Sequence, residues 1–262
     1  MANENYQEKL TGKVRSMKHI TDAAWDMVIE CPDAAQKAAA GQFAHLLPEG
    51  NFSLRRPISI CGIDKQAGTL RIVFEVRGEG TKKLAALKEG DSVNILAPLG
   101  HGFTLLPADS DVILIGGGIG TPPMLPLAQY YGKNAVFIGG CRTEKAAVLR
   151  DDFAKTGCES ILCTDDGSAG IHGLVTIPLA EKLAAKKPKM IYACGPMPML
   201  RAVAAMAKEN GIPCEVSLEE RMGCGIGACL VCACNVYIND GEIHAAHVCK
   251  DGPVFDAERV VW

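Results

Sequence analysis

Near its C-terminus, this 262-residue chain gathers five of its twelve cysteines into one glycine-rich segment. Cys224, Cys229 and Cys232 follow the spacing C-x4-C-x2-C, and Cys249 comes after sixteen intervening residues. Thiolates are preferred ligands of soft metal centres. Cysteines spaced this closely therefore predict a metal site, with the fifth one, Cys234, lying inside the same segment.

The spacing favours a 2Fe–2S cluster over a zinc ion. Three close cysteines followed by a distant one is the plant-type ferredoxin arrangement, in which each iron takes two thiolates. Gly223, Gly225 and Gly227 let the backbone approach such a cluster and turn N–H groups toward sulfide. Structural zinc, the alternative, usually takes two short-spaced pairs. We therefore predict the metal ligands to be Cys224, Cys229, Cys232 and Cys249.

The segment contains three other side chains that could bind metal. Cys234 lies two residues past Cys232, on the same face of a strand, and is predicted to be an unligated core residue, with a ligand exchange left open. His244 and His247 could serve a Rieske-type centre, but four cysteines suffice, so both are predicted at the surface. A hairpin around "INDGEI" should return the chain to Cys249.

Composition limits the class of protein. Apolar residues make up 48%, the formal net charge is −3, and no long basic run is present, which argues against nucleic acid as a partner. We find no secretory signal and no stretch approaching the ~18–20 apolar residues of a membrane span. The chain is predicted to be cytoplasmic and not membrane-bound. Disulfides are rare there, so the seven scattered cysteines are expected to be free, buried small apolar side chains.

Two patterns of secondary structure follow one another along the chain. Up to about Leu106, short runs with period-two stretches predict an antiparallel barrel or sandwich, interrupted by one helix at "GTKKLAALKEG". From Asp111 to about Cys214, strands alternate with helices, which predicts a doubly wound, mainly parallel sheet ending with the strand "GIPCEVSLE". The predicted domains are 1–106 (β barrel), 107–214 (α/β) and 215–262 (small 2Fe–2S ferredoxin-like domain).

The stretch "RRPISI" carries a first resemblance. Arg56-Pro57-Ile58-Ser59 resembles the R-x-Y-S element of the ferredoxin–NADP reductase superfamily. The resemblance implies an FAD-binding barrel in which the arginine meets the FAD pyrophosphate and the serine lies beside the flavin. A guanidinium offers a bidentate fork for phosphate, and a strand places Arg56 and Ile58 on one face and Ser59 on the other. The usual tyrosine is Ile58 here, which removes an aromatic partner.

Two further segments extend this resemblance. "RGEGT" resembles the superfamily's second phosphate loop, where Gly80 and Thr81 would present N–H groups and a hydroxyl at a helix N-terminus. Val73, Phe74 and Glu75 match the strand that borders the flavin in that superfamily. FAD is thus the predicted cofactor of the barrel.

A glycine-rich turn, "ILIGGGIGTPPML", opens the α/β half. Gly116, Gly118 and Gly120 follow the first strand at its carboxyl end, where open α/β sheets bind ligands. Thr121 is expected to cap the next helix, with Pro122 at its first position. This form resembles the superfamily turn that faces the nicotinamide dinucleotide, and a plain tight turn is the alternative.

Later strand ends agree with a dinucleotide site. "YACGPMPML" resembles the superfamily segment in which Cys194 and Gly195 would approach the nicotinamide. Asp165 and Asp166 either accept from ribose hydroxyls or are solvated turn residues, and both interpretations stay open. Arg142 stands alone, without the arginine cluster that a 2′-phosphate would need, which favours NADH over NADPH.

The three sites together indicate electron transfer. NADH gives two electrons as a hydride, a cluster takes one at a time, and a flavin can do both, so it belongs between them. We predict no acid–base or nucleophilic catalytic residue, because hydride transfer to flavin requires none. The substrate that is oxidised or reduced must then bind elsewhere, which indicates a subunit of a larger enzyme.

Over essentially its whole length, the chain resembles the family of electron-transfer subunits of NAD-dependent, B-type dihydroorotate dehydrogenases. "SLEERMGCGIGACLVCAC" and "VCKDGPVF" are the most specific parts of the resemblance. It implies a heterotetramer with two FMN-bearing catalytic subunits, passing electrons from dihydroorotate through FMN, 2Fe–2S and FAD to NAD in pyrimidine biosynthesis. The alternatives are an NADH-dependent reductase serving another flavoenzyme or a ferredoxin, and a zinc-stabilised binding or sensor module.

Overall fold

The computed structural model describes residues 10–238 and 241–262, which group into two compact units. The first unit runs to Gly102 and includes Glu219–Cys234 and Ala246–Pro253. The second holds Phe103–Leu218 with the remaining C-terminal stretches. The C-terminal segment is therefore shared between the two units. The three domain boundaries drawn from the sequence stay a prediction.

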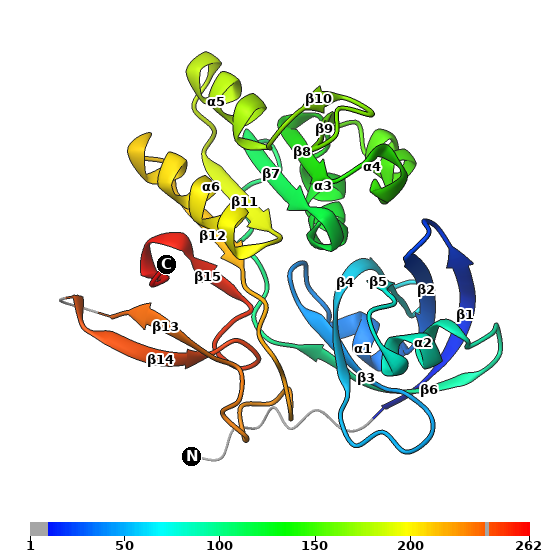
Figure 1. Ribbon diagram of the computed structural model, residues 1–262. Helices are drawn as coiled ribbons and strands as arrows, with labels where there is room; N and C mark the ends of the chain where they lie inside the picture. Colours follow the sequence, from blue (N-terminus) through cyan, green and yellow to red (C-terminus); the bar gives the residue numbers. More distant parts are fainter. Residues whose placement is uncertain (1–9, 239–240) are drawn as a thin grey trace. The chain divides into compact units, whose positions relative to one another are not determined.

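Six antiparallel strands of the first unit close into a barrel, as predicted (Figure 1). They are β1 (Leu10–His19), β2 (Ala24–Glu30), β3 (Phe43–Leu47), β4 (Arg56–Asp64), β5 (Thr69–Glu75) and β6 (Ser92–Leu99). In barrel order they run β1-β2-β5-β4-β3-β6. Alternate residues such as Met27 and Ile29, or Ala44 and Leu46, fill the interior. Side chains between them face outward, because successive residues of a strand point to opposite faces.

Two short helices accompany the barrel. α2 (Glu79–Ala85) overlaps the stretch predicted to be helical, starting one residue before it and ending at Ala85. α1 (Pro32–Lys37) was not predicted, since six residues are too few to show a helical period. Its sequence nevertheless carries a start signal, with Pro32 at the first helical position, where the missing N–H costs nothing.

The second unit contains a seven-stranded sheet in the order β10-β9-β8-β7-β11-β12-β15. Its strands are β7 (Val112–Gly117), β8 (Ala135–Cys141), β9 (Glu159–Thr164), β10 (Ile171–His172), β11 (Met190–Cys194), β12 (Cys214–Ser217) and β15 (Val254–Asp256). The pairs from β10 to β12 are parallel, which confirms the predicted α/β architecture. Every residue of β7 and of β11 is buried, as expected for strands covered on both faces.

Four helices connect these strands: α3 (Leu125–Tyr131), α4 (Arg150–Lys155), α5 (Thr176–Ala185) and α6 (Met197–Glu209). Figure 1 shows α3 and α4 on one side of the sheet and α5 and α6 on the other. This is the doubly wound arrangement, whose ligand sites lie at the carboxyl ends of the strands. Within the described part of the chain, no helix is long and apolar enough to cross a membrane.

The structure corrects two predictions for this unit. The strand from "GIPCEVSLE", β12, is not the last strand, because β15 pairs antiparallel beside it. Thr121 does not cap a helix: its φ of −64° and ψ of −46° are helical, and its side chain makes no capping bond. The chain already curls at Gly118–Gly120, so no extended cap residue precedes the 3-10 turn Pro122–Met124.

The remaining strands, β13 (Ala233–Tyr237) and β14 (Ile243–His247), form a separate two-stranded sheet. A hairpin around "INDGEI" was predicted here. Its tip includes residues 239–240, which lie outside the described residues. The two strands lead out of and back into the cysteine segment, so they set the separation of Cys232 from Cys249 along the chain.

Candidate iron–sulfur, flavin and dinucleotide sites

The four predicted ligand cysteines lie in the first unit and form two pairs. The Sγ atoms of Cys232 and Cys249 are 3.2 Å apart. In the other pair, the backbone N–H of Cys224 donates to the Cys229 sulfur and that of Cys229 to the Cys224 sulfur, both at 3.3 Å. Among the residues that the structure describes, no three His, Cys, Asp or Glu side chains are grouped to hold a single metal ion. Two pairs suit the two irons of a 2Fe–2S cluster better than one tetrahedral zinc.

Backbone N–H groups converge on the sulfurs. Cys224 Sγ accepts from Ile226 at 3.4 Å, from Ala228 at 3.2 Å and from Cys229 at 3.3 Å. Burial raises the pKa of the Cys224 thiol, but these N–H bonds outweigh burial and lower it from 9.0 to about 7. Cys249 Sγ accepts from the Gly227 N–H at 3.1 Å. Donors of this kind stabilise thiolates and tune the potential of an iron–sulfur centre.

The loop can curl around the sulfurs because two of its glycines adopt left-handed backbone angles. Gly225 has φ +73° and Gly227 has φ +81°, where side chains with a Cβ are strained. A methyl group added at Gly227 would also meet the side chain of Lys250 at 2.7 Å. Together with the converging N–H groups, this shape fits a compact anionic cluster.

The predictions for the exposure of the other histidines and cysteines are confirmed in part. His244 is exposed as predicted, whereas His247 is half-buried, with Nδ1 3.7 Å from the Asp251 carboxylate. Cys234, on β13 of the two-stranded sheet, is half-buried rather than a core residue. Of the seven scattered cysteines, Cys141 is half-buried and the other six are buried as predicted.

One buried residue beside this loop was missed by sequence reasoning. His45, on β3, is fully buried, and a methyl group added at Gly225 would overlap its ring. Burial lowers the pKa of His45 to about 4, and the positive charge of Arg55 adds to the effect. The sequence offered only a histidine within the apolar run "FAHLL", which is an ordinary pattern for a strand.

The two predicted phosphate elements of the barrel meet in the structure. A methyl group added at Gly80, in the first turn of α2, would overlap the guanidinium of Arg56 at the start of β4. The guanidinium lies 5.5 Å from the centre of the Phe52 ring, and its Nη1 donates to the Leu54 carbonyl at 2.6 Å. These contacts fix a half-exposed cation beside a helix start, which suits an anionic phosphate.

The other predicted FAD contacts next to Arg56 and Gly80 differ in their burial and hydrogen bonding. Thr81 Oγ1 accepts from the N–H groups of Arg77 at 3.0 Å and Gly78 at 3.2 Å, and donates to the Gly78 carbonyl at 3.0 Å. Its hydroxyl thus shapes the loop, while the N–H groups of the first turn of α2 lack intrahelical acceptors. Ile58 joins the barrel core, with Pro57 exposed and Ser59 half-buried beside it.

The strand predicted to border the flavin, β5, ends where this loop begins. Val73 and Phe74 are buried, and Glu75 is half-buried. The Glu75 carboxylate pairs with Arg77 at 2.8 Å. The strand end and the loop therefore form one continuous surface segment next to Arg56 and Gly80.

The predicted dinucleotide elements also come together, at the carboxyl ends of β7 and β11. A methyl group added at Gly120 would overlap the Cys194 carbonyl, and one at Gly195 would lie 3.0 Å from Gly117. At Gly116, an added methyl would lie 2.7 Å from the Thr121 Cα. Glycine is needed for this approach of turn and strand ends, which takes place at the edge where open α/β sheets bind ligands.

A cavity of about 290 Å³ adjoins the glycine turn. Its lining comes from the turn, the carboxyl-terminal part of β8, the middle of β9, and α4 with the segment before it, and includes Gly118, Thr121, Gly140, Cys141, Val148 and Arg150. This volume is close to the lower end of the range for small-molecule sites. The cavity is therefore a candidate for part of an extended dinucleotide.

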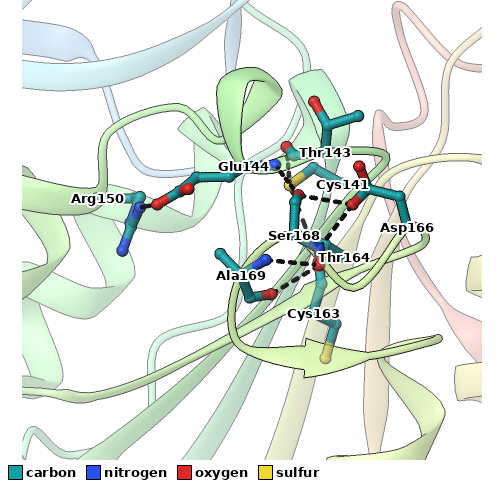
Figure 2. Close-up of polar contacts among 9 residues, drawn as sticks. All are labelled: Cys141, Thr143, Glu144, Arg150, Cys163, Thr164, Asp166, Ser168 and Ala169. Atoms are coloured by element: carbon teal, nitrogen blue, oxygen red, sulfur yellow. Dashed lines mark hydrogen bonds and ion pairs between the residues drawn. The ribbon is translucent and has the colours of Figure 1, made fainter.

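Figure 2 shows the polar network at the rim of this region. Asp166 Oδ1 accepts from the Ser168 hydroxyl at 2.6 Å and its N–H at 3.0 Å, and these bonds lower the pKa of Asp166. The Ser168 hydroxyl accepts from the Glu144 N–H at 2.7 Å. Glu144 Oε1 lies 2.8 Å from Arg150 Nη1. Of the two interpretations of Asp166, these bonds favour a turn residue.

Solved structures define the class of protein. An NADH-dependent reduced ferredoxin–NADP oxidoreductase, from work on flavin-based electron bifurcation, matches with a TM-score of 0.84 and 28% identity over 100% of this chain and 92% of that chain. A ferredoxin–NADP+ reductase from Neisseria gonorrhoeae, with bound FAD and NADP, shares the fold with a TM-score of 0.63 and 20% identity. The match covers 78% of this chain and 92% of that chain. The fold is that of a ferredoxin–NADP reductase-type oxidoreductase.

Sequence relatives define the family within this class. Residues 219–261 match the family model of the iron–sulfur cluster binding domain of dihydroorotate dehydrogenase B. The electron transfer subunit of dihydroorotate dehydrogenase B (NAD(+)) from Geobacillus kaustophilus is 40% identical over 262 residues, covering 97% of this chain and 98% of the relative. Its counterpart from Listeria innocua is 40% identical over 255 residues, covering 95% and 97%. The chain belongs to the family of dihydroorotate dehydrogenase B electron transfer subunits.

Proposed function

We propose that this chain carries electrons between an FMN-bearing dihydroorotate dehydrogenase catalytic subunit and NAD, through its own 2Fe–2S cluster and FAD. The observation that carries the proposal is the arrangement of the four cysteines as two pairs with converging N–H donors, in the same unit as the barrel. The names of the relatives, electron transfer subunits of an NAD(+)-linked enzyme, support it.

Each cofactor has a proposed set of residues. The cluster is held by Cys224, Cys229, Cys232 and Cys249. The FAD contacts are Arg56, Pro57, Ile58, Ser59, Val73, Phe74, Glu75, Gly80 and Thr81. The dinucleotide contacts are Gly116, Gly118, Gly120, Thr121, Cys194 and Gly195. When bound, the flavin exchanges a hydride with nicotinamide and single electrons with the cluster, so the chain itself has to bind, orient and shield.

The partner and the place of action follow from the same proposal. The relatives are named as subunits, so we propose a heterotetramer of two such chains with two catalytic subunits, acting in pyrimidine biosynthesis. The four proposed cluster ligands have to be thiolates, which suits a reducing compartment, and we propose the cytoplasm. The domain division 1–106, 107–214 and 215–262 belongs to this proposal as well.

The charge pattern near the cavity favours NADH. Arg150 lines the cavity, but its guanidinium is paired with the Glu144 carboxylate at 2.8 Å. Asp165 and Asp166 add negative charge at the end of β9. A 2′-phosphate would meet carboxylates and a neutralised arginine, whereas ribose hydroxyls can donate to carboxylates.

The test is to purify the chain with its native partner and to count iron, inorganic sulfide, FAD and FMN. We expect two irons, two sulfides and one FAD for each copy of this chain, and one FMN for each catalytic subunit. A colourless chain that holds zinc would overturn the proposal. If the chain carried all its cofactors but co-purified with a ferredoxin or another flavoenzyme, the assignment of dihydroorotate as the electron source would be overturned.

A further inference from the structure

His45 occupies an outward-facing position of the barrel that is nevertheless fully buried. Its neighbours Ala44 and Leu46 point into the barrel core, so the imidazole between them points out. His45 lies opposite Pro57 of β4 in the sheet register, beside the predicted FAD motif. The Cys224–Gly225 part of the cluster-binding loop covers it, within the same compact unit.

The ring nitrogens of His45 have no hydrogen-bond partner within the described residues. Buried polar atoms are rarely left unpaired, because an unpaired group loses its hydrogen bonds to water without replacing them. Gly225 lies directly against the ring, because a methyl group added to it would overlap Nδ1. The residue before Gly225 is Cys224, the first predicted cluster ligand, so its backbone carbonyl lies beside the imidazole.

We propose that His45 is a positioning residue for the iron–sulfur cluster. Its imidazole holds the Cys224–Gly225 peptide against the outer face of β3, and a ring N–H donates to the Cys224 carbonyl once the loop carries the cluster. This inference rests on the proposed function. Fixing the first ligand's backbone also fixes the N–H groups that reach the Cys224 sulfur, and it keeps the cluster at a constant separation from strand β4.

A purely structural role for His45 makes a different prediction. If the ring only fills space, leucine should replace it without harm to the cluster, and removing two unpaired polar atoms should stabilise the fold. If the ring positions the loop, the same substitution should loosen the cluster even where the fold is kept. Retention of iron therefore separates the two roles.

The test compares His45→Leu, which removes polarity, with His45→Gln, which keeps an N–H donor, in the full complex. The readouts are the rate of iron release to a chelator and the electron paramagnetic resonance spectrum of the reduced cluster. We expect His45→Leu to release iron about tenfold faster or more, the usual effect of losing an outer-shell partner, with a shifted spectrum and FAD content unchanged. His45→Gln should recover most of the loss. His19→Leu, at an exposed position on β1, is the matched control and should behave as the unmodified protein.

A second pair of variants keeps the inference testable if His45→Leu does not fold. Gly225→Ala places a methyl group on the ring, and His45→Ala removes the ring, so the double variant should retain iron better than Gly225→Ala alone. Strictly additive effects of the two substitutions, or wild-type iron release from His45→Leu, would overturn the inference. An unmodified protein that lacks iron and sulfide would instead overturn the proposed function.

Discussion

At the scale of single residues, the backbone N–H groups of the cysteine loop lower the pKa of one of its thiols. The N–H bonds to Cys224 bring its pKa to about 7, so a large share of this thiol is ionised at neutral pH. Cys249 differs, because burial raises its pKa to about 12.

Replacing Cys229 by serine should abolish the cluster and leave flavin chemistry intact. The Cys229 side chain is exposed on the loop, so its loss disturbs no core. We expect iron and sulfide to disappear, while NADH-dependent reduction of an artificial dye through FAD stays near the unmodified rate. Cys158→Ser, distant along the chain and unligated, is the control. A Cys229→Ser protein that kept its full iron content would disprove the ligand assignment.

Replacing Arg56 by alanine should weaken FAD retention. A charge-assisted hydrogen bond is worth about 1.5–3 kcal/mol, which corresponds to a loss of roughly 10- to 100-fold in affinity. Arg56→Lys should recover part of it, because an ammonium keeps the charge without the bidentate fork. Flavin content after gel filtration and a titration of the apoprotein with FAD measure this. Undiminished FAD binding by the alanine variant would refute a phosphate role.

At the scale of elements, prediction from the sequence succeeded where a pattern was long enough to show its period. The barrel strands and the alternating strands and helices of the sheet were found in this way. α1, β10 and β15 are six, two and three residues long, too short for periodicity to reveal. The capping role of Thr121 failed because the curl at Gly118–Gly120 depends on packing, which composition alone does not report.

The contact between the turn before α2 and Arg56 gives a prediction at this scale. Gly80→Ala should fit the helix but push a methyl group into the Arg56 guanidinium, so FAD affinity should fall with the fold preserved. Gly78→Ala is the matched control, since its extended φ of −173° suits any residue and open space surrounds the added methyl. Titration with FAD and thermal unfolding measure the two effects. Equal FAD affinity in both variants would contradict the proposed phosphate site.

The Glu144–Arg150 pair gives a second prediction, on dinucleotide choice. Glu144→Gln should release Arg150 for a 2′-phosphate, raising the NADPH to NADH ratio of kcat/KM. An exposed ion pair is worth at most about 1 kcal/mol, so we expect a change of roughly two- to fivefold. Adding Arg150→Ala should cancel the change. A ratio unaffected by Glu144→Gln would show that this network does not select the nucleotide.

At the scale of the whole molecule, the site predictions depended on how far apart the partners lie in sequence. The cluster ligands were proposed from the sequence because three of the four cysteines stand within nine residues, at a spacing typical of cluster coordination. His45 was not, because the loop that buries it begins almost 180 residues later. Burial created by a distant segment leaves no local signature in composition or periodicity.

Removing the cluster should loosen one part of the molecule and spare another. The cysteine loop is rich in glycine and has exposed apolar side chains at Leu230 and Val231, so we expect the metal to supply much of its order. After iron chelation we expect faster amide hydrogen exchange over 223–234 and 246–253, while β7 and β11 stay protected. Unchanged exchange in the loop would mean that the metal does not organise it.

The division of the last 44 residues between two compact bodies limits how this protein can be re-engineered. Glu219–Cys234 and Ala246–Pro253 belong with the barrel, whereas β15 completes the edge of the sheet. The segment 219–262 is consequently not an independent module that can be removed from one protein and added to another. A reductase that received this segment would need a barrel strand that packs against the cysteine loop as β3 does at His45, and an unpaired sheet edge beside its equivalent of β12. Transplanting the C-terminal segment alone should therefore yield a protein that assembles no metal centre.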